Sequence, residues 1–158
     1  MVVTKENIHL HILGEIDNSR YVKSIQRLCN RHKDWAFMEG RIVGVKKQGN
    51  IARHKFGISG CENESFGIAV AEMVKGGCIV WVPNGGGQVE IVNHPMLIYD
   101  SMEDAADKIE NVLKDDILQA ELRKHLAIQS KKFSHGRFIS ETKEVIHQFL
   151  ENDNRMST

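Results

Sequence analysis

The sequence has few cysteines, few prolines, no excess of either charge and no long hydrophobic run. Its three cysteines, Cys29, Cys61 and Cys78, include no C-x-x-C pair, which argues against a disulfide framework or a zinc knuckle. The longest purely apolar run covers residues 78–82, far fewer than the roughly 20 residues that a membrane span needs. We therefore expect a reduced, cytoplasmic protein without a transmembrane segment.

The charges balance, with 21 Lys and Arg against 21 Asp and Glu. No bulk electrostatic attraction for nucleic acid or anionic lipid follows from such a balance. A chain of 158 residues that is 41% hydrophobic and 27% charged is typical of one ordinary globular domain. Because two prolines leave few places for a linker, we expect a single domain over residues 1–151 and a frayed tail at 152–158.

The spacing of apolar residues alternates between strand-like and helical over the first two thirds of the chain. Alternating or continuous apolar runs predict five strands, at residues 7–13, 35–38, 55–59, 78–82 and 96–99. Helical spacing predicts helices between them, the first capped by Asn18 or Ser19, the others at residues 46–54, 67–75 and 88–92. This alternation with short loops predicts an α/β protein with a Rossmann-like, doubly wound parallel sheet.

The last third of the chain is predicted to be helical. Ser101 with Asp104 is typical of a helix cap, and one apolar stripe follows it: Met102, Ala105, Ala106, Ile109, Val112 and Leu113. A second helix is expected from residue 117 to about residue 131. Ser134 is a candidate cap for a third helix, with one apolar face formed by Phe138, Thr142, Val145 and Phe149.

Three glycine-containing loops follow predicted strands, at residues 39–43, 60–66 and 83–87. Doubly wound sheets bind ligands at the carboxyl ends of their strands, so these loops are where a site is expected. The segment after the second loop holds Glu72 among apolar neighbours, which predicts a carboxylate buried on a helix. Burial of a lone carboxylate costs several kcal/mol unless it is hydrogen-bonded. Its partner is either a lysine or backbone amides of this chain, or the paired hydroxyls of a ligand such as a ribose.

The start of the same helix is a candidate anion site. The N–H groups of Phe66, Gly67 and Ile68 lie at the positive end of the helix dipole, and Gly67 lets the backbone approach a phosphate closely. Glu64 would be repelled by a phosphate, so it is either an ordinary helix-terminal charge or a ligand for the hydroxyls of an attached sugar.

Three consecutive glycines, at positions 85, 86 and 87, form the third loop. The spacing of a G-x-G-x-x-G dinucleotide motif is absent. The loop is therefore either a tight connection or, beside Glu64 and Gly67, a second wall that admits a bulky ligand to the backbone. We favour the second interpretation, with Gly85 and Gly86 in contact with the ligand.

Residues 64–92 resemble the C-terminal, nucleotide-sugar-binding half of the retaining GT-B glycosyltransferases of family 4. The hallmark of that family is two glutamates separated by seven residues, which Glu64 and Glu72 match. The resemblance is dense over residues 55–92 and looser over residues 8–132. It is carried by these residues: Glu64-Ser65-Phe66-Gly67, Glu72-Met73, Gly77, Val80, Gly85, Gly86, Gly87 and Glu90-Ile91-Val92.

The resemblance implies the C-terminal half of a GT-B fold and a role for each matching position. Glu72 would bind the ribose hydroxyls, and Glu64, at the catalytic centre, would hold the hydroxyls of the donor hexose. The N–H groups of residues 66–68 would contact the diphosphate or the sugar. The loop of Gly40, Arg41 and Ile42 would flank the nucleobase.

The resemblance further implies a metal-independent enzyme of polysaccharide biosynthesis that needs no cofactor. Its donor would be a UDP- or GDP-sugar, with GDP-mannose suggested first by residues 64–68, and its acceptor a glycan or lipid-linked glycan. His9 and His11 share a predicted strand face without a third ligand, so we expect no metal site there.

The sequence also departs from the family. The acceptor-binding domain and the first strand–helix unit have no counterpart, and neither does the basic pair that neutralises the diphosphate; Arg53, Lys55 and Lys75 are better interpreted as surface charges. We expect weak or absent transfer by the isolated chain, and a partner that supplies the acceptor domain and could attach the chain to the inner membrane. We also expect self-association through an open strand edge.

Two other functions are compatible with parts of the sequence. A non-catalytic nucleotide-sugar-binding or interaction module, derived from such an enzyme, would explain the missing acceptor domain. A dinucleotide-dependent oxidoreductase is disfavoured because no strand is followed by G-x-G-x-x-G and a helix.

Overall fold

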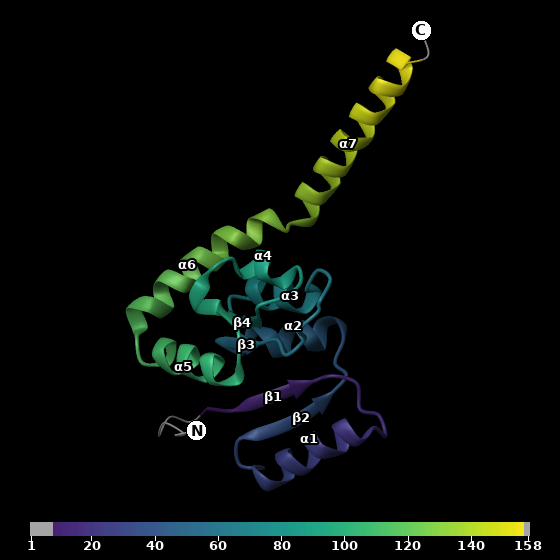
Figure 1. Cartoon of the computed structure of the whole chain (residues 1–158). Coiled ribbons are helices and arrows are strands. Elements are labelled where there is room, and N and C mark those ends of the chain that lie inside the picture. Colours follow the sequence, from purple (N-terminus) through teal and green to yellow (C-terminus); the bar gives the residue numbers. More distant parts are fainter. Residues whose placement is uncertain (1–7, 157–158) are drawn as a thin grey trace. The chain divides into compact units, whose positions relative to one another are not determined.

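The structure, a computed structural model, describes residues 8–156, apart from the side chains of residues 135 and 151–156 (Figure 1). The chain divides into two compact units, Met1–Asn50 and Ile51–Thr158. The single domain expected over residues 1–151 stays a prediction.

The first unit is built on two parallel strands joined by a helix. Strand β1 (Leu10–Leu13) pairs with β2 (Ala36–Gly40), with Leu10 opposite Ala36. Helix α1 (Arg20–Arg31) connects them and packs against β2 (Figure 1). It starts where the sequence predicts, because the Ser19 hydroxyl accepts a hydrogen bond from the Val22 N–H at 3.2 Å. Helix α2 (Gly44–Ala52) follows β2 and overlaps the helix expected at 46–54.

The second unit holds a three-stranded parallel sheet in the order β3-β4-β5. Its strands are β3 (Phe56–Ile58), β4 (Ile79–Pro83) and β5 (Ile98–Tyr99). Helix α3 (Ile68–Lys75) connects β3 to β4, and the short helices α4 (Gln88–Val92) and η1 (Pro95–Leu97) connect β4 to β5. These two crossovers give the strand–helix alternation that the sequence predicts.

Strand β4 lies at the centre of the hydrophobic core of this unit. All five of its residues are buried, and helices α3, α4 and α6 contact it. A parallel strand that is covered on both faces has a continuous apolar sequence. The apolar run at residues 78–82 predicts such a strand, and the structure confirms it. The core consists of thirteen buried residues: Val70, Val74, Cys78, Ile79, Val80, Trp81, Val82, Ile91, Val92, Leu97, Val112, Leu122 and Leu126.

Three helices form the last part of the chain: α5 (Met102–Leu113), α6 (Asp116–Lys132) and α7 (His135–Met156). The Ser101 hydroxyl caps α5 by accepting from the Asp104 N–H at 3.1 Å, as predicted. The Asp115 carboxylate caps α6 by accepting from the N–H groups of Ile117 and Leu118 at 3.0 and 2.9 Å. Within the part of the chain that the structure describes, none of the helices is both long and apolar enough to span a membrane.

The α/β class and the parallel strands are confirmed, with three differences in detail. The five described strands form two separate sheets rather than one. The strand expected at 96–99 is shortened, because Pro95 starts a 3-10 turn. Met102 and Ala106, expected on the apolar face of α5, are exposed, since only part of that stripe faces the core.

Helix α7 extends to Met156, into the segment expected to be a frayed tail; residues 157 and 158 lie outside the described residues. Phe138, Val145 and Phe149 lie at helical spacing as predicted, but they are 68%, 65% and 69% exposed. Nearby apolar side chains on the same helix, such as Ile146, are exposed as well. The apolar stripe of α7 is thus real but uncovered in this chain.

We predict that Leu122→Ala lowers the free energy of unfolding by about 2–5 kcal/mol, because Leu122 is 1% exposed in the core cluster and its truncation leaves a cavity. Urea denaturation followed by circular dichroism measures this. The control is Ile117→Ala on the same helix, where the side chain is 75% exposed and the expected change is within about 0.5 kcal/mol. Equal effects of the two substitutions would contradict the described core.

Candidate functional site

The carboxyl ends of β3, β4 and β5 meet at one edge of the second unit's sheet. Past the strand ends, the Asn84 N–H donates to the Tyr99 carbonyl at 2.8 Å. The Tyr99 hydroxyl donates to the Ser59 carbonyl at 2.6 Å. These hydrogen bonds fix the points at which two loops, residues 60–66 and 84–87, leave the sheet. Both loops therefore start at the edge where ligands of such sheets bind.

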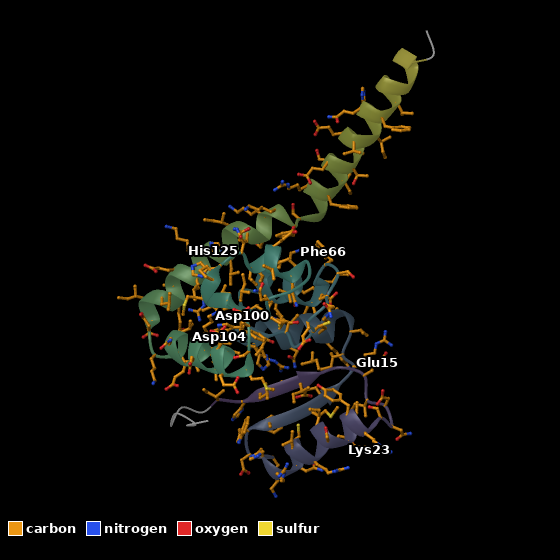
Figure 2. All side chains as sticks on the ribbon, in the orientation of Figure 1. Glu15, Lys23, Phe66, Asp100, Asp104 and His125 are labelled. Atoms are coloured by element: carbon orange, nitrogen blue, oxygen red, sulfur yellow. The ribbon has the colours of Figure 1, made fainter. Side chains whose placement is uncertain are left out.

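The charged groups described at this edge are mainly acidic. The Asn84 amide donates to the Asp100 carboxylate at 2.8 Å, and the Asp100 N–H donates to Asp104 at 3.0 Å (Figure 2). Lys108 donates to Asp104 at 2.8 Å, and this hydrogen bond holds the pKa of the Asp104 carboxyl below its ordinary value. Burial, and then the negative charge of Glu62, raise the pKa of the nearby tyrosine hydroxyl, that of Tyr99.

The two loops are in direct backbone contact. The Gly87 N–H donates to the Glu64 carbonyl at 2.9 Å. A Cβ on Gly85 would overlap the carbonyl oxygen of Glu62, and a Cβ on Gly86 would overlap that of Glu64. A Cβ on Gly87 would lie 2.5 Å from the Ser65 carbonyl oxygen. Gly86 also has a φ of +68°, which side chains disfavour. The glycines are therefore required by the contact between the loops.

This contact changes the interpretation of the triple glycine. The sequence predicts that Gly85 and Gly86 open the backbone to a ligand, whereas a Cβ on either residue would face the loop of residues 60–66. The alternative interpretation of the three glycines, a tight connection, describes this packing better. Contact of these two residues with a ligand through their backbone stays a prediction.

Gln88, which no sequence pattern indicates as a site residue, joins the same two loops. Its side chain is fully buried, and its amide nitrogen donates to the carbonyls of Cys61 at 2.5 Å and Gly85 at 3.3 Å. A single glutamine in a short helical turn carries no signal by spacing, so only the three-dimensional arrangement reveals it.

Helix α3 begins without a side-chain cap. Its N-cap is Gly67, with φ 94° and ψ 48°, a left-handed conformation suited to glycine. The free N–H groups of the first turn are therefore those of residues 68–70, since the Ala71 N–H already donates to the Gly67 carbonyl. Of the three N–H groups predicted, that of Ile68 lies in this turn, that of Gly67 at the cap, and that of Phe66 before the helix.

Glu72 is exposed, so the prediction that it is buried is wrong. Helix α3 buries only Val70 and Val74 fully, and Ile68 is 65% exposed although it is apolar. Apolar neighbours in sequence did not imply burial, because one face of this short helix is uncovered in the chain. Burial therefore gives no reason for Glu72 to need a ligand, and its role toward a ribose stays a prediction.

Glu64 and Phe66 lie on the loop before α3. Glu64 is partly buried, and its backbone carbonyl is held by Gly87. Phe66 is 49% exposed and makes an edge-to-face contact with Phe133 at the end of α6, with ring centroids 6.0 Å apart. An exposed aromatic ring, that of Phe66 (Figure 2), and the partly buried Glu64 thus both precede α3 on the same loop.

The third group of predicted residues, Gly40, Arg41 and Ile42, belongs to the first unit, whereas the other candidate residues belong to the second. Gly40 ends β2 with a φ of 72°, and its carbonyl accepts from the Gly14 N–H at 3.1 Å. Arg41 forms an exposed ion pair with Glu15 at 3.4 Å. Their role at a nucleobase stays a prediction.

Three basic residues were considered as neutralisers of a diphosphate. Arg53, Lys55 and Lys75 are all exposed, as the interpretation as surface charges predicts. Among residues 8–156 as described, no group of three or more His, Cys, Asp or Glu side chains is arranged to hold a metal ion.

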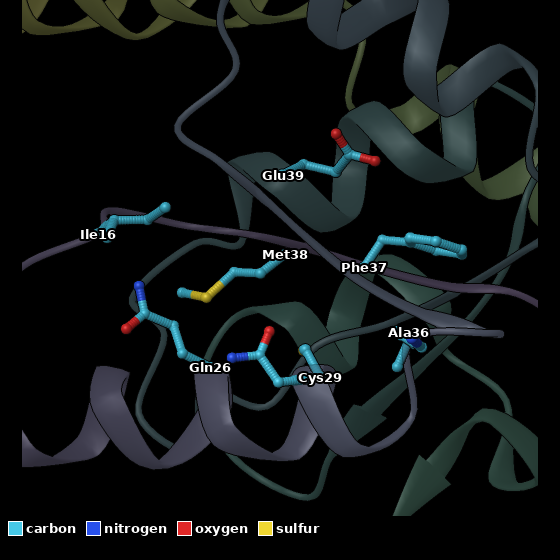
Figure 3. Close-up of a pocket in the computed structure, with 9 residues that line it drawn as sticks. Ile16, Gln26, Cys29, Ala36, Phe37, Met38 and Glu39 are labelled. Carbon is cyan, nitrogen blue, oxygen red and sulfur yellow. The ribbon is translucent and has the colours of Figure 1, made fainter.

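Two of the cavities in the described structure are not lined by the predicted site residues on the loops at 40–42, 64–68 and 85–86 or by Glu72. One, of about 520 Å³, lies in the first unit between α1 and β2 and is lined by Gln26, Cys29 and Met38 among others (Figure 3). The second, of about 270 Å³, is lined by residues of α3 and α6, with Cys78 at its wall. Burial raises the pKa of the Cys78 thiol, which donates to the His54 carbonyl at 3.2 Å.

No family model and no curated protein matches this chain. Solved structures do match: HepE of Anabaena in complex with UDP, with a TM-score of 0.75, and the same protein in complex with UDP-glucose, with a TM-score of 0.74. Each is 18% identical, and the match covers 89% of this chain but only 41% of the HepE chain. The likeness confirms the predicted Rossmann-like α/β fold of the GT-B kind.

We predict that Gly86→Ala lowers the free energy of unfolding by about 2 kcal/mol or more, because the added methyl group meets the Glu64 carbonyl at a positive φ. The control is Gly136→Ala, where no atom lies within 4 Å and alanine favours the helix by about 0.5–1 kcal/mol. Thermal denaturation of both variants checks the prediction. An unchanged midpoint for Gly86→Ala would show that the two loops are not packed as described.

Proposed function

We propose that this chain is the donor-binding domain of a retaining GT-B glycosyltransferase, which transfers a hexose from a nucleotide-diphosphate sugar to a glycan or lipid-linked acceptor. One observation carries the proposal. Two loops, residues 60–66 and 84–87, are in backbone contact at the carboxyl edge of a parallel sheet. The first of them leads into helix α3, which has no side-chain cap, with Glu64 just before the helix and Glu72 within it. The likeness in fold to a protein solved with UDP and UDP-glucose supports it.

The chemistry of this edge suits a sugar nucleotide better than a free anion. The N–H groups of residues 68–70 can donate hydrogen bonds to a diphosphate, which the α3 dipole also attracts. The carboxylates of Glu62 and Glu64 repel negative charge. Carboxylates accept hydrogen bonds from hydroxyl groups, so Glu64 would hold the hexose and the exposed Glu72 the ribose. We assign no basic side chain to the diphosphate, so its negative charge is not neutralised and we expect weak binding. We also propose that binding needs no metal ion.

We propose two candidate donors, which differ in their base and their sugar. GDP-mannose follows from the family resemblance of residues 64–68. UDP-glucose follows from the ligands named for HepE. Both belong in any test, with UDP and GDP alone beside them.

Transfer requires an acceptor site, which we assign to a partner domain or subunit. The chain spans 41% of the length of the HepE chain that it matches. In retaining enzymes of this type, the acceptor attacks from the face that the leaving group occupies, and the donor phosphate takes the acceptor proton. Positioning and leaving-group stabilisation supply most of the rate, so the chain alone should transfer slowly or not at all.

The alternative is a non-catalytic nucleotide-sugar-binding or interaction module. One observation favours this alternative. A leaving diphosphate needs its charge neutralised, and the three basic residues considered for that role are exposed surface charges: Arg53, Lys55 and Lys75. Binding without any transfer, even with an acceptor domain added, would select this alternative.

We predict that one nucleotide and its sugar bind in the millimolar to micromolar range, and that Glu72→Gln weakens both about tenfold by removing a charged hydrogen bond to the ribose. Isothermal titration calorimetry with UDP, GDP, UDP-glucose and GDP-mannose measures this. The matched control is Glu121→Gln, an exposed glutamate on α6, which should leave the affinities unchanged. Addition of EDTA should also leave them unchanged.

Absence of binding by every one of these ligands would remove the proposal. Equal losses in Glu72→Gln and Glu121→Gln would remove the ribose role of Glu72 alone.

We further predict that Glu64→Gln lowers the affinity for the nucleotide sugar but not the affinity for the free nucleotide. Because Glu64 is assigned to the hexose, the substitution should weaken the nucleotide sugar about tenfold and leave the free nucleotide unchanged. Titration of the same variant with both ligands gives the ratio directly. A loss of affinity for the free nucleotide as large as that for the nucleotide sugar would place Glu64 elsewhere.

A further inference from the structure

Gln88 is in contact with both ends of the segment that carries Glu64. Its amide nitrogen donates to the carbonyl of Cys61, which lies three residues before Glu64. Its Cβ lies 3.0 Å from the place where a Cβ would stand on Gly67, three residues after Glu64. One buried side chain thus brackets residues 61–67.

The orientation of the Gln88 amide is set by its surroundings. Both of its partners, Cys61 and Gly85, offer carbonyl oxygens, and only the NH2 group of a glutamine can donate to them. The Oε1 atom therefore points the other way, and it is buried without a hydrogen-bond partner among the described residues.

An unsatisfied buried oxygen lowers the stability of a fold. A methionine of similar size would fill the same space without that cost, although it would donate no hydrogen bond. What Gln88 adds over such a residue is the connection between the two loops. This points to a role in the geometry of the loops rather than in the stability of the core.

The connection reaches Glu64 from both sides. The Gly87 N–H holds the Glu64 carbonyl at 2.9 Å, and Gln88 is the next residue in the chain. Glu64 is therefore fixed by a main-chain hydrogen bond, while Gln88 anchors the segment at Cys61. The same contacts set the distance from Glu64 to the first turn of α3, which starts after Gly67.

We propose that Gln88 is a positioning residue, which holds residues 61–67 so that the Glu64 carboxylate and the free amides of α3 meet one ligand together. This proposal rests on the proposed function of the site. Gln88 does not touch the ligand, because its side chain is fully buried. It acts through Glu64.

The test compares Gln88→Met with a matched control, Gln119→Met, in the full chain. Gln119 is also a buried glutamine whose amide donates to main-chain carbonyls, those of Val112 at 3.0 Å and Leu113 at 3.5 Å, but it joins α5 to α6. Both variants lose a buried amide, so a general loss of stability should appear in both. Affinities for UDP-glucose, GDP-mannose, UDP and GDP are measured by calorimetry well below the unfolding temperature.

We expect Gln88→Met to lower the affinity for the nucleotide sugar about tenfold, which is the effect of losing about one hydrogen bond to the ligand. The affinity for the free nucleotide should fall less. Gln119→Met should change neither. In a Glu64→Gln background the effect of Gln88→Met on the nucleotide sugar should fall to the smaller effect that it has on the free nucleotide, because the hexose contact through which the rest of the effect acts has been removed. Hydrogen exchange should speed up in a peptide covering residues 60–67 and not in β4.

Should Gln88→Met not fold, Gln88→Asn serves instead, since it keeps the amide but is one methylene too short to span the two loops. Equal affinities of the Gln88 and Gln119 variants, or additive losses in the Glu64→Gln background, would overturn the positioning role while leaving the proposed function intact. Absence of any nucleotide binding by the wild type would overturn both.

Discussion

The candidate site depends on the contact between two backbone segments, residues 62–65 and residues 85–87. Three glycines in a row allow the second segment to lie against the carbonyl groups of the first, where any side chain would collide. The hydrogen bond from Gly87 to the Glu64 carbonyl and the amide of Gln88 then fix the register of the two loops. Without this contact, Glu64 would sit on a free loop with no defined position relative to α3.

The electrostatics of the edge follow from what these loops carry. The amides at the start of α3 attract an anion, whereas Glu62, Glu64 and Asp100 repel one. A ligand that combines a diphosphate with hydroxyl groups satisfies both kinds of group, and a simple phosphate does not. This is the physical reason for proposing a sugar nucleotide as the ligand.

Local features of the fold were predictable because they depend on residues close together in the chain. Ser19, Ser101 and the continuous apolar run of β4 each gave the element expected from them. The start of α3 was predicted one residue early, since Gly67 is its cap rather than its first residue. For the site, the sequence located both loops and the order of the two glutamates along the chain.

The sequence by itself determined the α/β class, the parallel strands and the segments at which a ligand could bind, because these follow from periodicity, caps and strand–helix order. Only the tertiary structure decided that Glu72 is exposed, that the glycines face a loop and that Gln88 ties the loops together. These depend on which distant segment covers a side chain. Spacing along the chain states which residues share a face, but not what lies against that face.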